Sequence, residues 1–134
     1  FYLSTVISAN CIKELCKSLC DVIIMAIYVR TCQPRKLLED IKQAINDKKI
    51  VTWGYDNDGD FYHTPEQWNY KAWLSPTISD NDLIFGIVGE KDKNMSVETY
   101  AVYHGRFSEM LLAHFDQEFS NVSSTAQKTQ YDRF

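Results

Sequence analysis

The sequence predicts a single α+β domain, with a mixed, mostly antiparallel sheet of about five strands and helices packed on one face. Three observations lead to this fold class. The 134 residues are 45% hydrophobic and 24% charged, which are ordinary values for one globular domain with one core. A helical pattern lies between apolar runs at 22–30 and 50–55, as in a crossover connection. The later apolar runs are separated only by short polar turns, as in hairpins.

The N-terminal half predicts helices and strands in alternation. Residues 2–7 fit either a short strand or an irregular lead-in, and apolar residues at helical spacing then predict a helix over 10–20. Residues 22–30 are rich in β-branched side chains and predict a strand buried on both faces. Pro34 fits the first turn of a second helix, which an apolar stripe continues. Residues 50–55 predict the next strand.

The C-terminal half predicts a short helix, three strands and a final helix. Residues 64–67 have the pattern of a capping box with proline at the first helical position, so a short helix is expected there. Gly105 is expected to open the last helix, and residues 121–134 to form a polar, loosely ordered tail after a domain of residues 1–120. The three strands are expected over residues 71–77, 82–89 and 96–103.

Residues 53–73, WGYDNDGDFYHTPEQWNYKAW, form the most unusual segment of the chain. They contain three tryptophans, three tyrosines, one histidine and three alternating aspartates. Connections between strands are usually short and poor in large aromatic residues. Rigid rings beside uncompensated carboxylates are typical of a recognition surface. The alternative is a solvated bend whose aspartates only shape the turn.

The acidic charge of the protein is concentrated in its C-terminal part. Residues 1–54 hold eight Lys/Arg and five Asp/Glu, a net +3, whereas residues 55–134 hold six and thirteen, a net −7. A field of this sign repels nucleic acid and attracts a basic protein. We therefore expect a protein-binding surface at one end of the sheet. Its expected residues are Asp56, Asp58, Asp60, Tyr62, His63, Trp68, Asp80, Asp82 and Glu90.

The three aspartates also imitate the beginning of a calcium-binding loop, D-x-D-x-D. Phe61 stands where such a loop needs its glycine, and Gln67 stands where it needs a bidentate glutamate. The alternative function is accordingly a small metal-binding or enzymatic domain that uses these aspartates with His63. No nucleophile motif or phosphate-binding loop accompanies them, so we expect no enzyme activity and no cofactor.

The cysteines and the apolar runs bear on the compartment. Cys11, Cys16, Cys20 and Cys32 fit no zinc pattern and are expected to be small buried thiols in a reducing compartment. The apolar run at 22–29 is too short to cross a bilayer, and residues 1–11 lack the positive region of a secretory signal. A cytoplasmic location without membrane contact is expected.

Three motifs resemble the immunity proteins of bacteria: W-x-Y-D-x-D-G-D-F-x-H-T-P-x-Q-W from Trp53 to Trp68, K-A-W-L at 71–74 and Y-H-G-R-F at 103–107. The chain is similar to the small cytoplasmic antitoxins of contact-dependent inhibition and other polymorphic toxin systems. This resemblance implies a non-catalytic protein that binds a cognate toxin domain, often a nuclease, and blocks its active site. It implies no binding residue by position. A monomer or weak dimer is expected.

Overall fold

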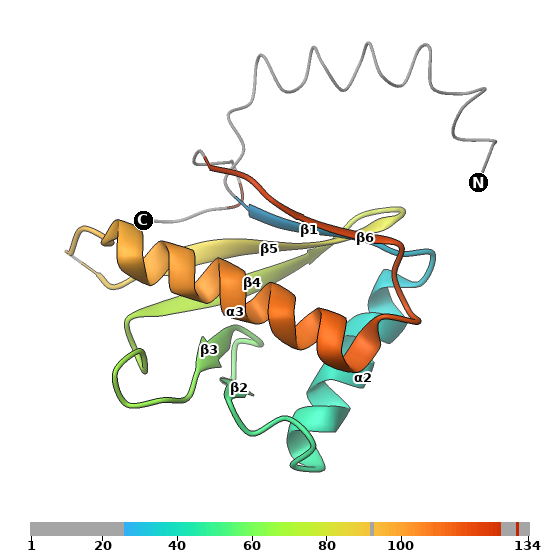
Figure 1. The fold of residues 1–134 in the computed structure, drawn as a ribbon, viewed down its shortest axis with the longest axis horizontal. Helices are drawn as coiled ribbons and strands as arrows, with labels where there is room; N and C mark the ends of the chain where they lie inside the picture. Colours follow the sequence, from blue (N-terminus) through green and yellow to red (C-terminus); the bar gives the residue numbers. More distant parts are fainter. Residues whose placement is uncertain (1–25, 92, 127–130, 132–134) are drawn as a thin grey trace, which may run out of the picture.

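A six-stranded antiparallel sheet forms the body of the protein, in a computed structural model that describes residues 26–91, 93–126 and 131 (Figure 1). Two helices accompany the sheet, and the predicted α+β class is confirmed. The strand order is β2-β3-β4-β5-β1-β6. The strands are β1 Ala26–Arg30, β2 Trp53–Tyr55, β3 Phe61–His63, β4 Ala72–Ile78, β5 Asp82–Gly89 and β6 Asn121–Ser124, and the helices are α2 Pro34–Asn46 and α3 Val97–Phe115.

Every pair of neighbouring strands is antiparallel, so the sheet is not mixed as expected. The crossover through α2 exists, but it carries the chain from β1 to β2 at the far edge of the sheet. Three strands lie between these two, and no parallel pair is formed. The hairpin of β4 and β5 matches its prediction closely, because Asp82–Gly89 coincides with the predicted strand.

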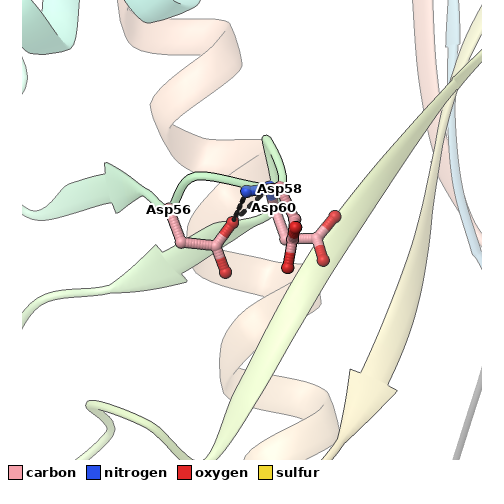
Figure 2. A group of neighbouring side chains, drawn as sticks. All are labelled: Asp56, Asp58 and Asp60. Carbon is pink, nitrogen blue, oxygen red and sulfur yellow. Dashed lines mark hydrogen bonds between the residues drawn. The ribbon is translucent and has the colours of Figure 1, made fainter.

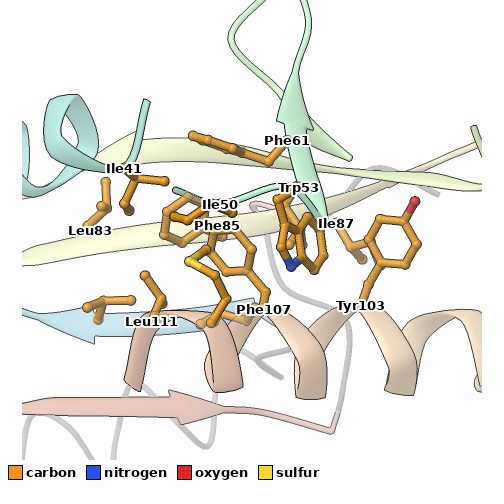
Figure 3. Packing of buried hydrophobic residues seen from close by; sticks show 14 of the residues in the cluster. Ile41, Ile50, Trp53, Phe61, Leu83, Phe85, Ile87, Tyr103, Phe107 and Leu111 are labelled. Atoms are coloured by element: carbon orange, nitrogen blue, oxygen red, sulfur yellow. The ribbon is translucent and has the colours of Figure 1, made fainter. Parts of the chain in front are cut away.

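The hydrophobic core lies between the sheet and both helices (Figure 3). Side chains alternate along each strand, so Phe61, Leu74 and Phe85 point to the same face and pack there. Phe107 of α3 touches this layer, with its ring centroid 4.6 Å from that of Phe85. Ile41 brings α2 into the same cluster. Both helices therefore cover one face of the sheet, as predicted.

Helix α3 begins eight residues before the expected helix, and the predicted strand at 96–103 is wrong. Ser96 caps the helix by accepting a hydrogen bond from the N–H of Thr99 at 3.0 Å. The β-branched and aromatic residues of this segment suggested a strand, but Thr99, Tyr103 and Phe107 are buried at helical spacing. Packing of this stripe outweighs strand propensity, and it leaves Gly105 exposed in the middle of the helix.

The prediction of a short helix beginning at residues 64–67 is also wrong. Residues 65–71 form turns, in which the carbonyl of Pro65 accepts from the N–H groups of Trp68 and Asn69. The hydroxyl of Thr64 donates to the carbonyl of Val51 rather than capping a helix. Before this turn lies β3, a three-residue strand that the sequence did not predict.

The ends of the chain require two further corrections. Residues 121–124 were assigned to a loose tail, but they form β6, paired along β1 at the edge of the sheet. Cys32 was expected to be buried and is exposed. The other three cysteines and the segments predicted at 2–7, 10–20 and 22–25 lie outside the described residues. Neither α2 nor α3 has the length and hydropathy that crossing a bilayer requires.

The face of the sheet opposite the helices is divided into two halves. Over β5 and β1, the backbone of Tyr131 lies so close that a Cβ on Gly86 would be 1.9 Å from its carbonyl oxygen. The ring of Tyr131 also meets Tyr28 edge-on, with centroids 6.4 Å apart. Over β2, β3 and β4, no described helix or strand lies on this face. We call this second half the open face.

Candidate functional site

Residues 56–60 form a tight loop between β2 and β3, which we call the acidic loop (Figure 2). The N–H of Asp56 donates to the carbonyl of Asp60, and the N–H of Gly59 donates to the carbonyl of Asp56, each at 3.0 Å. Gly59 has φ +83°, a left-handed conformation that glycine adopts without strain. One carboxylate oxygen of Asp56 accepts from the N–H groups of Asp58 and Asp60, both at 3.0 Å. Asp56 therefore stabilises the turn, as the alternative interpretation of this segment expected.

The three aspartates, which we call the acidic cluster, bring their carboxylates together. One oxygen from each of Asp56, Asp58 and Asp60 lies within 4.8 Å of the others. Asp58 is exposed, and its two neighbours are half-buried. Among residues 26–91, 93–126 and 131, no lysine or arginine forms a salt bridge with Asp56 or Asp58. Asp58 thus presents its negative charge to solvent, while the Nζ of Lys42 lies beside the loop, 3.5 Å from where a Cβ on Gly59 would stand.

The loop does not take the path of a calcium-binding loop. After Asp60 the chain enters β3 directly at Phe61, instead of turning around an ion. Three carboxylates supply only part of the six to eight oxygen ligands that calcium takes. The cluster could hold a weakly bound cation, but the rest of a coordination shell would have to come from water.

His63 lies apart from the acidic cluster, on the buried face of β3. It is 3% exposed and stacks on Trp53 with ring centroids 4.5 Å apart. Its Nδ1–H donates to the carbonyl of Thr52 at 2.7 Å, and its Nε2 accepts from Arg106 at 3.2 Å. Burial lowers the pKa of His63, and the guanidinium of Arg106 lowers it further. His63 is therefore buried apart from the acidic cluster, and its expected role in binding a partner or a metal stays a prediction.

Trp68 is a second predicted contact residue that the structure buries. Its side chain is 7% exposed, and Arg106 lies over its ring at 5.9 Å. The hydroxyl of Tyr103 donates to its backbone carbonyl at 2.7 Å. Trp53 is buried as well, at 2% exposure, whereas Trp73 is half-buried on β4. Two of the three tryptophans in residues 53–73 therefore pack in the core and hold this part of the chain against it.

The remaining predicted carboxylates do not form one surface. Asp80 is exposed in the turn between β4 and β5, and Asp82 follows it within 3.9 Å of Arg30. Glu90 follows the other end of β5. It lies about 25 Å from Asp82, because an extended strand rises about 3.3 Å per residue. It pairs with Lys93 at 2.9 Å. The expectation that Glu90 shares one end of the sheet with the others is wrong.

Tyr62 lies on the open face, and its ring contacts a second tyrosine that the sequence did not suggest. Its ring stacks on that of Tyr70, with centroids 6.0 Å apart and planes 23° from parallel. Tyr70 is 63% exposed and has φ 62°. No local pattern predicts this pair, because Tyr70 reaches Tyr62 only through the turn at 65–71. Alternation along β2 and β3 could have placed Gly54 and Tyr62 on one face.

A cavity lies at the N-terminal end of α2, away from the acidic cluster. It has a volume of about 670 Å³, and the first turn of α2 and the α3–β6 connection contribute to its lining. At its edge, Lys36 bridges Asp40 at 2.5 Å and Glu118 at 3.4 Å. Burial raises the pKa of Glu118, and nearby Asp40 raises it further. The lining of this cavity also includes Cys32, an exposed free cysteine, but no histidine.

No known protein-family model matches the chain, and no curated protein or solved structure is significantly similar to it. Any function of the acidic cluster therefore has to be inferred from its own chemistry.

Proposed function

We propose that this protein is a non-catalytic inhibitor that binds a positively charged protein domain, in the manner of an immunity protein that neutralises a bacterial toxin. The observation that carries the proposal is the acidic cluster, whose carboxylates are gathered on a tight loop. Gathering like charges on one loop is unfavourable, so further positive charge beside the loop is stabilising. A basic partner, such as the phosphate-binding site of a nuclease, supplies that charge on binding.

The rigidity of the loop also supports a binding role. Backbone hydrogen bonds and the two bonds to the Asp56 carboxylate hold the loop in one shape before any partner arrives. A surface that is already ordered loses less conformational entropy on association. Opposite charge on the partner raises the association rate through long-range attraction, which salt screens over about 10 Å at 0.1 M. In this proposal the inhibitor acts in the cytoplasm, on a toxin domain that has entered it.

The test is a co-expression experiment. The gene of this protein is placed with the toxin domain encoded next to it, and growth of the bacterial host is measured. We expect the wild-type protein to restore growth. Asp58→Lys with Asp60→Lys should slow association with the purified toxin domain by about tenfold at low salt and flatten its salt dependence. The control is Glu39→Lys with Glu98→Lys, which makes the same change in net charge at exposed positions on the two helices.

Two results would refute the proposal. One is the absence of any adjacent toxin domain whose toxicity this protein suppresses. The other is an association rate that does not depend on ionic strength and is equal for both double variants.

A second candidate function, cation binding, is favoured by the 4.8 Å spacing of the three carboxylates. It is tested by adding millimolar calcium or magnesium during thermal unfolding. A cation that binds the native state must raise the melting temperature, and Asp58→Asn must remove the shift. Under our proposal, calcium and magnesium leave the melting temperature unchanged.

A further inference from the structure

A pocket lies between α3 and the β2–β3 hairpin, at the end of the hairpin opposite the acidic loop. Its volume is about 290 Å³, at the lower end of the range for sites that bind small molecules. The ring of Trp53 points from the hairpin towards α3 and, with Met110, contributes apolar surface (Figure 3). Titratable side chains line the rest of the pocket: His63, Arg106, Glu109 and His114.

The guanidinium of Arg106 is held at this pocket by two contacts. Its Nη1 donates to Nε2 of His63 at 3.2 Å, and its central carbon lies 5.9 Å from the centre of the Trp68 ring. His63 is itself fixed by its bond to the carbonyl of Thr52 at 2.7 Å and by stacking on Trp53. Arg106 is therefore positioned before any ligand arrives, which lowers the entropy lost on binding.

The positive charge of Arg106 has no counter-ion among the described residues, because none of the salt bridges there includes it. Its partner His63 accepts as a neutral ring, since burial lowers the pKa of His63 and Arg106 lowers it further. That bond uses one of the five donors of the guanidinium and leaves the charge uncompensated. Glu109 lines the same pocket from the next turn of α3 without pairing with Arg106.

We propose that this pocket binds the carboxylate of a small organic acid, which pairs with Arg106 while the body of the acid lies against the apolar wall. This inference goes beyond the proposed function and does not depend on it. A guanidinium presents two parallel donors that match the two oxygens of a carboxylate. A phosphate ester carries about two negative charges at neutral pH. One fixed cation with Glu109 nearby suits a single negative charge better.

The test is a titration of benzoate into the full chain at neutral pH and constant ionic strength, followed by NMR. Benzamide, a neutral compound of the same shape, and phenyl phosphate are titrated in parallel. We expect benzoate to shift the backbone signals of Thr52, His63 and Arg106 and the Nε–H signal of Arg106. Benzamide should shift them much less at the same concentration, and phenyl phosphate should bind more weakly than benzoate.

Three variants locate the binding energy. Arg106→Gln should weaken the binding of benzoate by about fivefold or more. The matched control is Arg35→Gln, the same change of charge at an exposed site on α2, which should bind benzoate as the wild type does. Glu109→Gln removes a negative charge that repels the ligand, so it should tighten binding by about twofold at low salt. Glu109 is exposed, so this variant keeps the fold and tests the pocket without changing Arg106.

Four results would overturn the inference: equal shifts with benzoate and benzamide, the absence of benzoate binding, shifts located elsewhere, and equal affinity in the wild type and in Arg106→Gln. Weaker binding of benzoate by Glu109→Gln would also contradict it, because the ligand would then not be an anion held near that carboxylate. Tighter binding of phenyl phosphate than of benzoate would overturn the assignment to a carboxylate.

Discussion

Replacing His104 by leucine should make the stability of the protein less sensitive to acid. The imidazole of His104 is 3% exposed on α3, and its Nδ1–H donates to the carbonyl of Tyr100 at 2.9 Å. Its Nε2 is buried and has no hydrogen-bond partner among the described residues. Burial lowers the pKa of His104 from 6.5 to about 4, although the bond to Tyr100 opposes this change. The native state therefore holds a neutral histidine that the unfolded chain would protonate.

The sign and size of the effect follow from this difference. Because the native pKa lies below the unfolded value, the free energy of unfolding falls as the pH drops from 6.5 to 4 and levels off below pH 4. The complete loss is about 3 kcal/mol, at 1.36 kcal/mol for each unit of pKa. Between pH 7.5 and pH 5 the loss due to His104 is about 2 kcal/mol.

Urea unfolding at pH 7.5 and pH 5, followed by tryptophan fluorescence and circular dichroism, measures this quantity. His104→Leu should lose about 2 kcal/mol less than the wild type between the two pH values. His114→Gln, an exposed change on the same helix, is the control and should behave as the wild type does. An identical loss of stability in the wild type and in His104→Leu would refute the reasoning.

Three further predictions concern stability at neutral pH. Phe107→Ala should lower the free energy of unfolding by about 3–5 kcal/mol, because this ring is fully buried, whereas Leu112→Ala at a 53% exposed site should change it by less than about 0.5 kcal/mol. Ser96→Ala should cost about 1 kcal/mol through loss of the helix cap, and Ser96→Thr should recover most of it in the same urea titration. Asp56→Ala should cost about 1–2 kcal/mol and make the amides of the acidic loop exchange faster, whereas Asp56→Asn keeps an acceptor for both N–H groups and should preserve the loop. Equal exchange rates in the two Asp56 variants would contradict this role.

The local sequence pattern was sufficient to predict a helix or strand where the element is long and its periodicity is unambiguous. Proline at the first position and the buried Leu37 and Ile41 define α2, and β-branched residues between two turns define β5. It was insufficient in the first half of α3, whose residues favour a strand by propensity. There, Tyr103 packs against Trp53, and the next turn of the helix places Phe107 in the same core. This packing stabilises a helix instead of a strand. The three residues of β3 are too few to show a period.

The candidate site shows the same division. The location of the acidic loop could be predicted, since its turn depends on Asp56 and Gly59, which act within a few residues of each other. The exposure of each nearby side chain could not. Whether a tryptophan or histidine points to the core or to solvent depends on strand register, and a shift of one residue exchanges the two faces.

The sequence by itself therefore determined the α+β class, the acidic loop and the excess of negative charge in the C-terminal part. Only the tertiary structure decided that His63 and Trp68 are buried, that Glu90 lies at the opposite end of the sheet, and that Tyr70 stacks on Tyr62. The reason is physical. Turn geometry and charge are properties of neighbouring residues, whereas the composition of a surface is set by pairing between strands and by packing between residues far apart in the chain.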